Sequence, residues 1–211
     1  MQLVYPEDVP TSVDFQKPEH ARQWTDETVR KRPWRANFFA DFCTALTGSQ
    51  LRILELGSGP GHLAREVLSR CDVAEYLALD FSDPMHDLAR EHLGEFVSHV
   101  TFVTRDFRVP DWTQGLGALD AIVTMQAVHE TRHKARALPL LVQARTLLRP
   151  GGRLLYCDHY FEDAKSRGFY SSALNSPSCC APPATRTCAC CAMRAAWRCT
   201  PHSKRWRGTR G

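Results

Sequence analysis

The chain has 211 residues, of which 43% are hydrophobic, and a formal net charge of +4. This length suits one compact domain that buries about 70% of its unfolded surface. No apolar stretch reaches the roughly 20 residues of a membrane-spanning helix, and the N-terminus lacks the layout of a signal peptide, so we expect a soluble cytoplasmic protein.

Charge and cysteine are distributed unevenly along the chain. Residues 1–163 contain 18 Lys and Arg against 23 Asp and Glu, whereas residues 164–211 contain nine basic residues and no acidic one. Three cysteines lie in the first part and six in the second. The first part is therefore mildly acidic, its cysteines are expected to be reduced, and the net charge by itself does not indicate a nucleic-acid partner.

The N-terminal segment, residues 1–50, is predicted to be helical. Helices are expected at residues 19–32 and 35–46, separated by Pro33, with several aromatic side chains for packing. Two interpretations are open for this segment. It is either a helical layer packed on the next domain or a lid over a ligand site.

From residue 51 onward, short apolar runs alternate with amphipathic segments, the pattern of a parallel sheet covered by helices on both faces. Ser82 is a candidate N-cap with Pro84 in the first turn of its helix. The sequence thus predicts an α/β fold, a doubly wound and mostly parallel sheet, over residues 51–163, with a ligand at the carboxyl edge of the strands. The expected strands are 51–56, 76–80, 100–104, 119–125 and 152–158, and the expected helices are 61–70, 84–93 and 135–148.

The strongest local signal is ELGSGPG, Glu55 to Gly61, between a strand and a helix. Alternate glycines let the backbone turn sharply and approach a ligand at a helix N-terminus. The next strand ends in Asp80, 23 residues after Gly57, where a carboxylate can accept hydrogen bonds from both ribose hydroxyls. The spacing differs from the dinucleotide pattern G-x-G-x-x-G, so a nucleoside without a pyrophosphate is expected.

Together with LALDFSDPMHDLARE, RDF, DAIVTMQAVHE and LRPGG, this loop resembles the class I methyltransferases that use S-adenosylmethionine. The likeness is greatest to the small-molecule branch similar to ubiquinone/menaquinone-biosynthesis methyltransferases, and it covers about residues 51–161. It implies a Rossmann-like fold and S-adenosyl-L-methionine as cofactor. The cofactor-binding residues that it implies are Glu55, Gly57, Ser58, Gly59, Gly61, Asp80, Phe81, Met85, Asp106, Phe107 and Met125.

The resemblance also implies individual roles. The three glycines would line the methionine part, and Glu55 would orient the loop or reach the amino group through water. Asp80 would hold the ribose, Phe81 and Met85 would flank the adenine, and Asp106 would contact the adenine amino group with Phe107 as a backbone contact. Outside this context Met85 could be plain core, and Asp106 could simply cap a turn.

Methyl transfer depends chiefly on in-line positioning, with removal of a proton from the acceptor where necessary. Candidate proton acceptors therefore lie after the fourth and fifth strands, and histidine suits this role near neutral pH. We predict His129, Glu130 and His159 as catalytic residues. His133, Asp158 and Tyr160 are weaker candidates because they could be ordinary solvated residues. A magnesium site on the same side chains is conceivable, but the spacing does not identify one, and no metal is predicted.

Two acceptor classes can be argued against. The motif typical of base amino-group methylation is absent after the fourth strand, where the chain has Met125 to Val128. Cytosine C5 chemistry needs a nucleophilic cysteine, and the nearest one, Cys157, lies inside a predicted strand. A small-molecule methyl acceptor is therefore expected, while the oligomeric state is not indicated.

The tail, residues 164–211, is rich in Arg, Cys and Pro and shows none of the expected pattern for sixth and seventh strands. The leading interpretation is a disordered segment unrelated to the fold, as a shifted reading frame would produce. Two alternatives stay open. The tail could form a binding module for zinc or RNA, or the chain could be a catalytically silent fragment that still binds cofactor.

Overall fold

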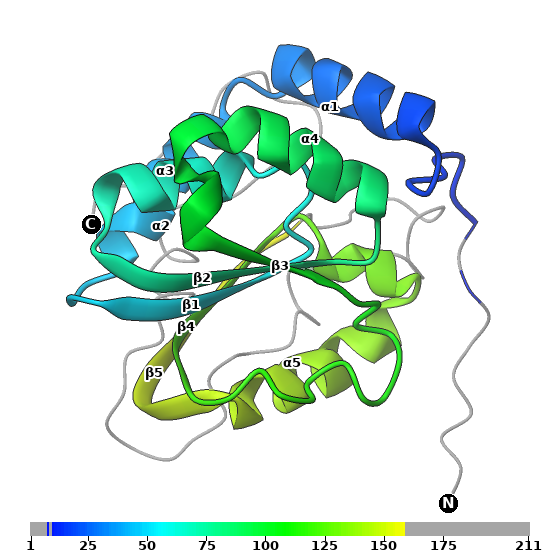
Figure 1. The fold of residues 1–211 in the computed structure, drawn as a ribbon. Helices are drawn as coiled ribbons and strands as arrows, with labels where there is room; N and C mark the ends of the chain where they lie inside the picture. Colours follow the sequence, from blue (N-terminus) through cyan, green and yellow to red (C-terminus); the bar gives the residue numbers. More distant parts are fainter. Residues whose placement is uncertain (1–7, 9, 159–211) are drawn as a thin grey trace, which may run out of the picture.

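The computed structural model describes residue 8 and residues 10–158. In this part a sheet lies between two layers of helices (Figure 1). The strands are β1 (Leu51–Leu56), β2 (Val73–Asp80), β3 (Val100–Thr104), β4 (Leu119–Met125) and β5 (Leu148–Cys157). The helices are α1 (Pro18–Lys31), α2 (Arg35–Ala45), α3 (His62–Arg70), α4 (Asp83–Leu93) and α5 (Ala137–Thr146), with short 3-10 turns η1 (Gly94–His99), η2 (Val128–Thr131) and η3 (Lys134–Arg136).

The five strands form one sheet in the order β3-β2-β1-β4-β5, and every pairing among them is parallel. Leu54 of β1, for example, lies between Leu77 of β2 and Ile122 of β4. The prediction of a doubly wound parallel sheet is confirmed. The predictions for the sixth and seventh strands and for the tail concern residues outside the described part of the chain.

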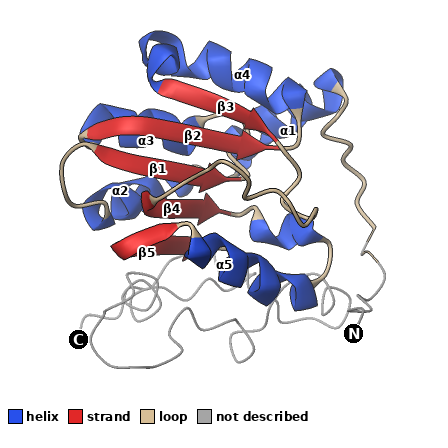
Figure 2. Ribbon diagram, turned by 60° about the horizontal axis from the view of Figure 1, so that its bottom comes forward, coloured by secondary structure: helices blue, strands red, loops and turns tan. Residues whose placement is uncertain are grey.

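Side chains of alternate strand residues build two cores on opposite faces of the sheet. One core joins Ile53 and Val123 to helices α2, α3 and α4, and the other joins Leu54 and Ile122 to α5 and the loop after β3. Figure 2 shows α5 on the opposite face from α3 and α4. Because both faces are covered, β1, β2 and β4 read as nearly continuous apolar runs.

Local signals explain where the helices begin. The Ser82 side chain accepts a hydrogen bond of 3.1 Å from the backbone N–H of Met85, which confirms the predicted N-cap of α4. Helix α5 ends at Thr146, earlier than predicted, because Leu148 already pairs with Leu119 of β4. Pro150 lies in β5 where the pairing with β4 has a register irregularity, between the partners Leu148 and Arg153.

The N-terminal helices lie on the same side of the sheet as α3 and α4. Helix α2 packs in the core through Phe39 and Phe42, while α1 crosses α4, where Arg22 pairs with Glu91 at 3.0 Å. Whether residues 1–50 act as a lid stays a prediction. No helix in the described part of the chain is long and apolar enough to span a membrane.

Candidate active site

The glycine loop between β1 and α3 has three glycines in the left-handed region, and they face different surroundings. A Cβ on Gly57 would lie 2.3 Å from the Cβ of Ala127, and one on Gly61 would lie 3.0 Å from the Cβ of Ala89. A Cβ on Gly59 would meet no atom within 4 Å. Gly57 and Gly61 therefore allow close packing of protein on protein, whereas Gly59 faces an open cradle.

Asp80, at the end of β2, is joined directly to this loop. One of its carboxylate oxygens accepts a 2.8 Å hydrogen bond from the Gly59 N–H, and the other accepts a 3.0 Å bond from the Ser82 N–H. Only 7% of the residue is exposed. Burial raises the pKa of Asp80 to about 6, although these backbone donors act in the opposite direction. The carboxylate is thus ionised near neutral pH and fixed beside the glycine cradle.

Glu55, near the end of β1, is a buried acid beneath the same loop. The hydroxyl of Tyr76 donates a 2.8 Å hydrogen bond to its Oε2 atom. Burial raises the pKa of Glu55 to about 8, and the hydrogen bond from Tyr76 offsets only part of this shift. Glu55 is therefore mainly protonated at neutral pH before any ligand binds, a property that its position in the motif did not reveal.

A cavity of about 330 Å³ opens at the carboxyl edge of the sheet. One wall is the N-terminal segment from Thr11 to Phe15, together with Asp8. The opposite wall contains four of the predicted site residues and two arginines: Phe81, Asp106, Phe107, Glu130, Arg108 and Arg132. The N-terminal segment is held here because Gln16 donates a 2.7 Å hydrogen bond to the carbonyl of Phe81.

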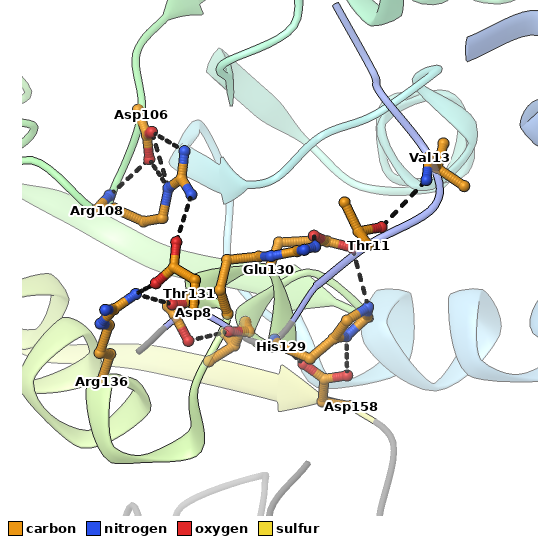
Figure 3. Close-up of polar contacts among 12 residues, drawn as sticks. Asp8, Thr11, Val13, Asp106, Arg108, His129, Glu130, Thr131, Arg136 and Asp158 are labelled. Carbon is orange, nitrogen blue, oxygen red and sulfur yellow. Dashed lines mark hydrogen bonds and ion pairs between the residues drawn. The ribbon is translucent and has the colours of Figure 1, made fainter. Parts of the chain in front are cut away.

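Asp106 is already ion-paired in this cavity (Figure 3). The Arg108 Nε donates to both carboxylate oxygens of Asp106 at 3.0 and 2.9 Å, and its Nη2 donates at 2.6 Å. Asp8 forms ion pairs with Arg108 and Arg136, so it links the segment before α1 to the loops after β3 and β4. A contact between Asp106 and adenine would have to compete with Arg108.

His129 and Asp158 form a pair across the ends of β4 and β5 (Figure 3). The His129 Nδ1 donates to one oxygen of Asp158 at 2.7 Å, and the His129 backbone N–H donates to the other at 3.0 Å. Its Nε2 lies 3.4 Å from Glu130, which is also 3.2 Å from Arg132. Burial alone would lower the pKa of His129, but the carboxylates of Asp158 and Glu130 outweigh it and raise that pKa well above its usual value. The ring is therefore an imidazolium at neutral pH.

Other predicted residues lie elsewhere or outside the described part. Met85 packs with Ala21 of α1, and Met125 lies in the core on the α2 and α3 side of the sheet. Their proposed contacts with cofactor stay predictions. His133 accepts a hydrogen bond from the Ala135 N–H, while His159 and Tyr160 are not described. Among the described residues, no cluster of three His, Cys, Asp or Glu side chains is arranged to hold a metal ion.

Sequence reasoning missed several polar groups around the glycine loop. Four buried side-chain atoms near it have no hydrogen-bond partner in the described structure: Arg35 Nε, Ser58 Oγ, His62 Nε2 and Gln126 Oε1. Gln126 also has a positive φ of 56°, a conformation that a non-glycine residue rarely adopts. Ser58 and Gln126 lie within motifs of the sequence, and His62 directly follows the glycine loop as the first residue of α3. Arg35, the first residue of α2, comes from a segment outside these motifs.

Comparison with known families gives a match over most of the sheet. Residues 53–152 match the family described as "Methyltransferase domain". Polyketide synthase 19 of Gibberella fujikuroi is 33% identical over 110 residues, which are 50% of this chain and 4% of that protein. Highly reducing polyketide synthase 40 of Fusarium pseudograminearum is 33% identical over 124 residues, which are 54% of this chain and 5% of that protein. The chain thus spans only a small part of these curated relatives.

Solved structures share the fold. An O-methyltransferase family protein from Burkholderia thailandensis has a TM-score of 0.54 and 23% identity, with 66% of this chain and 42% of that chain covered. The complex of DhpI with SAH also has a TM-score of 0.54, with 21% identity and coverage of 76% of this chain and 81% of that chain. At this level of identity the likeness establishes the arrangement of helices and strands.

Proposed function

We propose that residues 53–152, which match the family described as "Methyltransferase domain", bind S-adenosylmethionine and that the chain methylates a small molecule. The observation that carries the proposal is the 2.8 Å hydrogen bond from the Gly59 N–H to Asp80, at a glycine whose Cβ position has no protein atom within 4 Å. A carboxylate at the end of the second strand can bind the ribose hydroxyls of a nucleoside, and a glycine turn at the end of the first strand lets the backbone approach it closely.

The residues present fit this cofactor. The ionised Asp80 can accept hydrogen bonds from ribose hydroxyls, Phe81 offers a ring on the cavity wall, and Ser58 has a buried hydroxyl oxygen without a partner. The cofactor supplies an activated methyl group on a sulfonium. The chain must therefore bind, orient the acceptor and exclude water, which makes positioning its main contribution.

We propose that His129 assists the loss of a proton from the acceptor. With the cofactor bound, its methyl group would pass to the acceptor atom and S-adenosylhomocysteine would remain, so the acceptor would have to lose its proton to a residue of the chain or to water. Asp158 fixes the orientation of the His129 ring, and Glu130 lies at its other nitrogen. As an imidazolium, His129 stabilises an oxyanion on the acceptor. It serves as the proton acceptor only after it passes its own proton to a neighbouring carboxylate or to water.

The relatives named above are polyketide synthases, which supports a small, polyketide-like acceptor. We also propose a cytoplasmic location, because Cys43 and Cys71 are free thiols, as is usual in reducing compartments.

Calorimetric titration of the chain with S-adenosylhomocysteine tests the cofactor proposal. We expect saturable binding, and we expect Asp80→Asn to weaken it about 10- to 100-fold, because hydrogen bonds to a charged group contribute about 1.5–3 kcal/mol. The matched control is Asp87→Asn, which removes a carboxylate of α4 that is paired with Arg90 on the surface. Absence of heat with the native chain, or equal losses in both variants, would refute the proposal.

A further inference from the structure

Arg35, the first residue of α2, carries a cation for which the described residues supply no counter-ion. Its Nε is buried without a hydrogen-bond partner, and within the described residues its guanidinium forms neither an ion pair nor a hydrogen bond. The guanidinium carbon lies over the ring of Phe39, one helical turn later, at 5.6 Å from the ring centroid. A partly desolvated guanidinium in this state is costly unless an anion joins it.

The groups around Arg35 do not supply that anion. The groups whose negative charge would act on Arg35 are the carboxyl of Glu55 and, more weakly, the thiol of Cys157. However, burial raises the pKa of Glu55 to about 8, and Glu55 already accepts its hydrogen bond from Tyr76. Burial lowers the pKa of Arg35 only to about 10, so the guanidinium stays charged at neutral pH. A cation therefore faces a mainly neutral acid.

The same region contains further unpartnered polar atoms next to the glycine loop. His62 begins α3 directly after Gly61, and the Arg35 charge acts on its ring. That ring stacks on His92 at a centroid distance of 4.6 Å and leaves its buried Nε2 without a partner. Ser58, within the loop, has a buried hydroxyl oxygen that also lacks a hydrogen-bond partner among the described residues. Polar groups that are unsatisfied together at one place indicate a polar ligand.

We propose that Arg35 binds the α-carboxylate at the methionine end of the cofactor and so selects ligands that carry an amino-acid group. This inference rests on the proposed function, because it places the nucleoside at Asp80 and the amino-acid group on the α2 side of the glycine loop. A guanidinium and a carboxylate form a strong, charge-assisted contact, which is strengthened further where water is excluded. The contact would also relieve the unpaired charge of Arg35.

A structural role for Arg35 is the competing explanation, since its side chain covers Phe39. The two can be separated with a pair of ligands. S-adenosylhomocysteine contains the amino-acid group, and 5′-methylthioadenosine retains the nucleoside and the sulfur but lacks that group. Loss of the carboxylate contact lowers the affinity for S-adenosylhomocysteine alone, whereas a distorted site lowers the affinity for both ligands.

The experiment titrates both ligands into the native chain, Arg35→Met, Arg35→Lys and the control Arg30→Met, which removes an exposed arginine of α1. We expect Arg35→Met to lower the affinity for S-adenosylhomocysteine about 10- to 100-fold and to change the affinity for 5′-methylthioadenosine less than about twofold. Arg35→Lys should recover part of the loss, because it restores the charge but not the fork of donors. Arg30→Met should behave as the native chain.

Two results would overturn the role of Arg35 while the proposed function stands. One is native affinity for S-adenosylhomocysteine in Arg35→Met, and the other is an equal loss of affinity for both ligands in that variant. A native chain that binds neither ligand would overturn the inference and the proposed function together. Thermal unfolding of each variant shows whether an equal loss comes from a destabilised fold.

Discussion

The two halves of the candidate site are built in different ways. The nucleoside half consists of the glycine loop and Asp80, which lie within a single strand-helix-strand unit and touch through the Gly59 N–H. The acceptor half joins His129 to Asp158 across two strand ends and includes Asp8 from near the N-terminus. Local sequence therefore determines the first half, whereas the second depends on how distant segments meet.

The largest expected effect separates two glycines of the nucleoside half. Gly57→Ala places a Cβ 2.3 Å from that of Ala127 and forces a non-glycine residue to a φ of 67°. Overpacking and the left-handed strain together should cost about 2–5 kcal/mol of unfolding free energy. Gly59→Ala meets no protein atom and should cost only about 1–2 kcal/mol, yet weaken S-adenosylhomocysteine binding.

Urea unfolding and ligand titration of both variants check this contrast. If Gly57→Ala were as stable as Gly59→Ala, the packing role assigned to Gly57 would be wrong. If Gly59→Ala bound ligand with native affinity, the cradle beside Gly59 would not be where the cofactor lies.

In the acceptor half, His129 should make stability depend on pH. Its pKa is raised in the folded state, so its contribution is fully present below the unfolded histidine value of about 6.5 and is lost as pH rises through the folded value. We expect the difference in unfolding free energy between the native chain and His129→Asn to shrink steadily above about pH 6.5. The exposed His99 provides the control variant, His99→Asn. A difference that grows with pH would contradict the ion pair with Asp158.

In the nucleoside half, Glu55 should make the unfolding free energy depend on pH. Because its pKa is raised to about 8, the stability linked to its protonated form is present below the unfolded value of about 4.3 and declines as pH rises through about 8. Glu55→Gln removes this decline. Between the unfolded and folded pKa values, the unfolding free energy of the variant should therefore rise relative to that of the native chain by at most about 1.4 kcal/mol per pH unit. Parallel stability curves at pH 5 to 9 would show that Glu55 is ionised throughout.

The smallest effect is expected for Asp8, which links Arg108 and Arg136 and is half-exposed. Surface ion pairs contribute about 0–1 kcal/mol each, so Asp8→Asn should barely change the unfolding free energy. If residues 8–16 act as a lid, the same variant should speed S-adenosylhomocysteine dissociation severalfold in stopped-flow experiments. An unchanged rate would leave this segment as a fixed wall of the cavity.

Much of the fold could be predicted from the sequence because its signals are local. The ranges of β1, β3 and β4 agree with the predicted strands, and Ser82 caps α4 as its position before Pro84 indicates. The limits of α5 and β5 were missed because pairing with β4 at Leu119 overrides the turn signal at Pro150.

The candidate site divides in the same manner. Asp80 and Gly59 are brought together as the motif spacing indicates. The roles of Gly57 and Gly61 in packing and the surroundings of Arg35 depend on tertiary contacts that no local pattern encodes. Asp106 and Arg108 are only two residues apart, but their ion pair was not predicted. Met85 was predicted to contact the cofactor but packs in a core cluster, because an apolar residue within a motif can equally serve the core.

A crystal structure of the chain with S-adenosylhomocysteine would test the central claim most directly. We expect the ribose hydroxyls to lie within hydrogen-bond distance of the Asp80 carboxylate, beside the Gly59 N–H. Ligand density at the opposite edge of the sheet, or a ribose out of reach of Asp80, would contradict it.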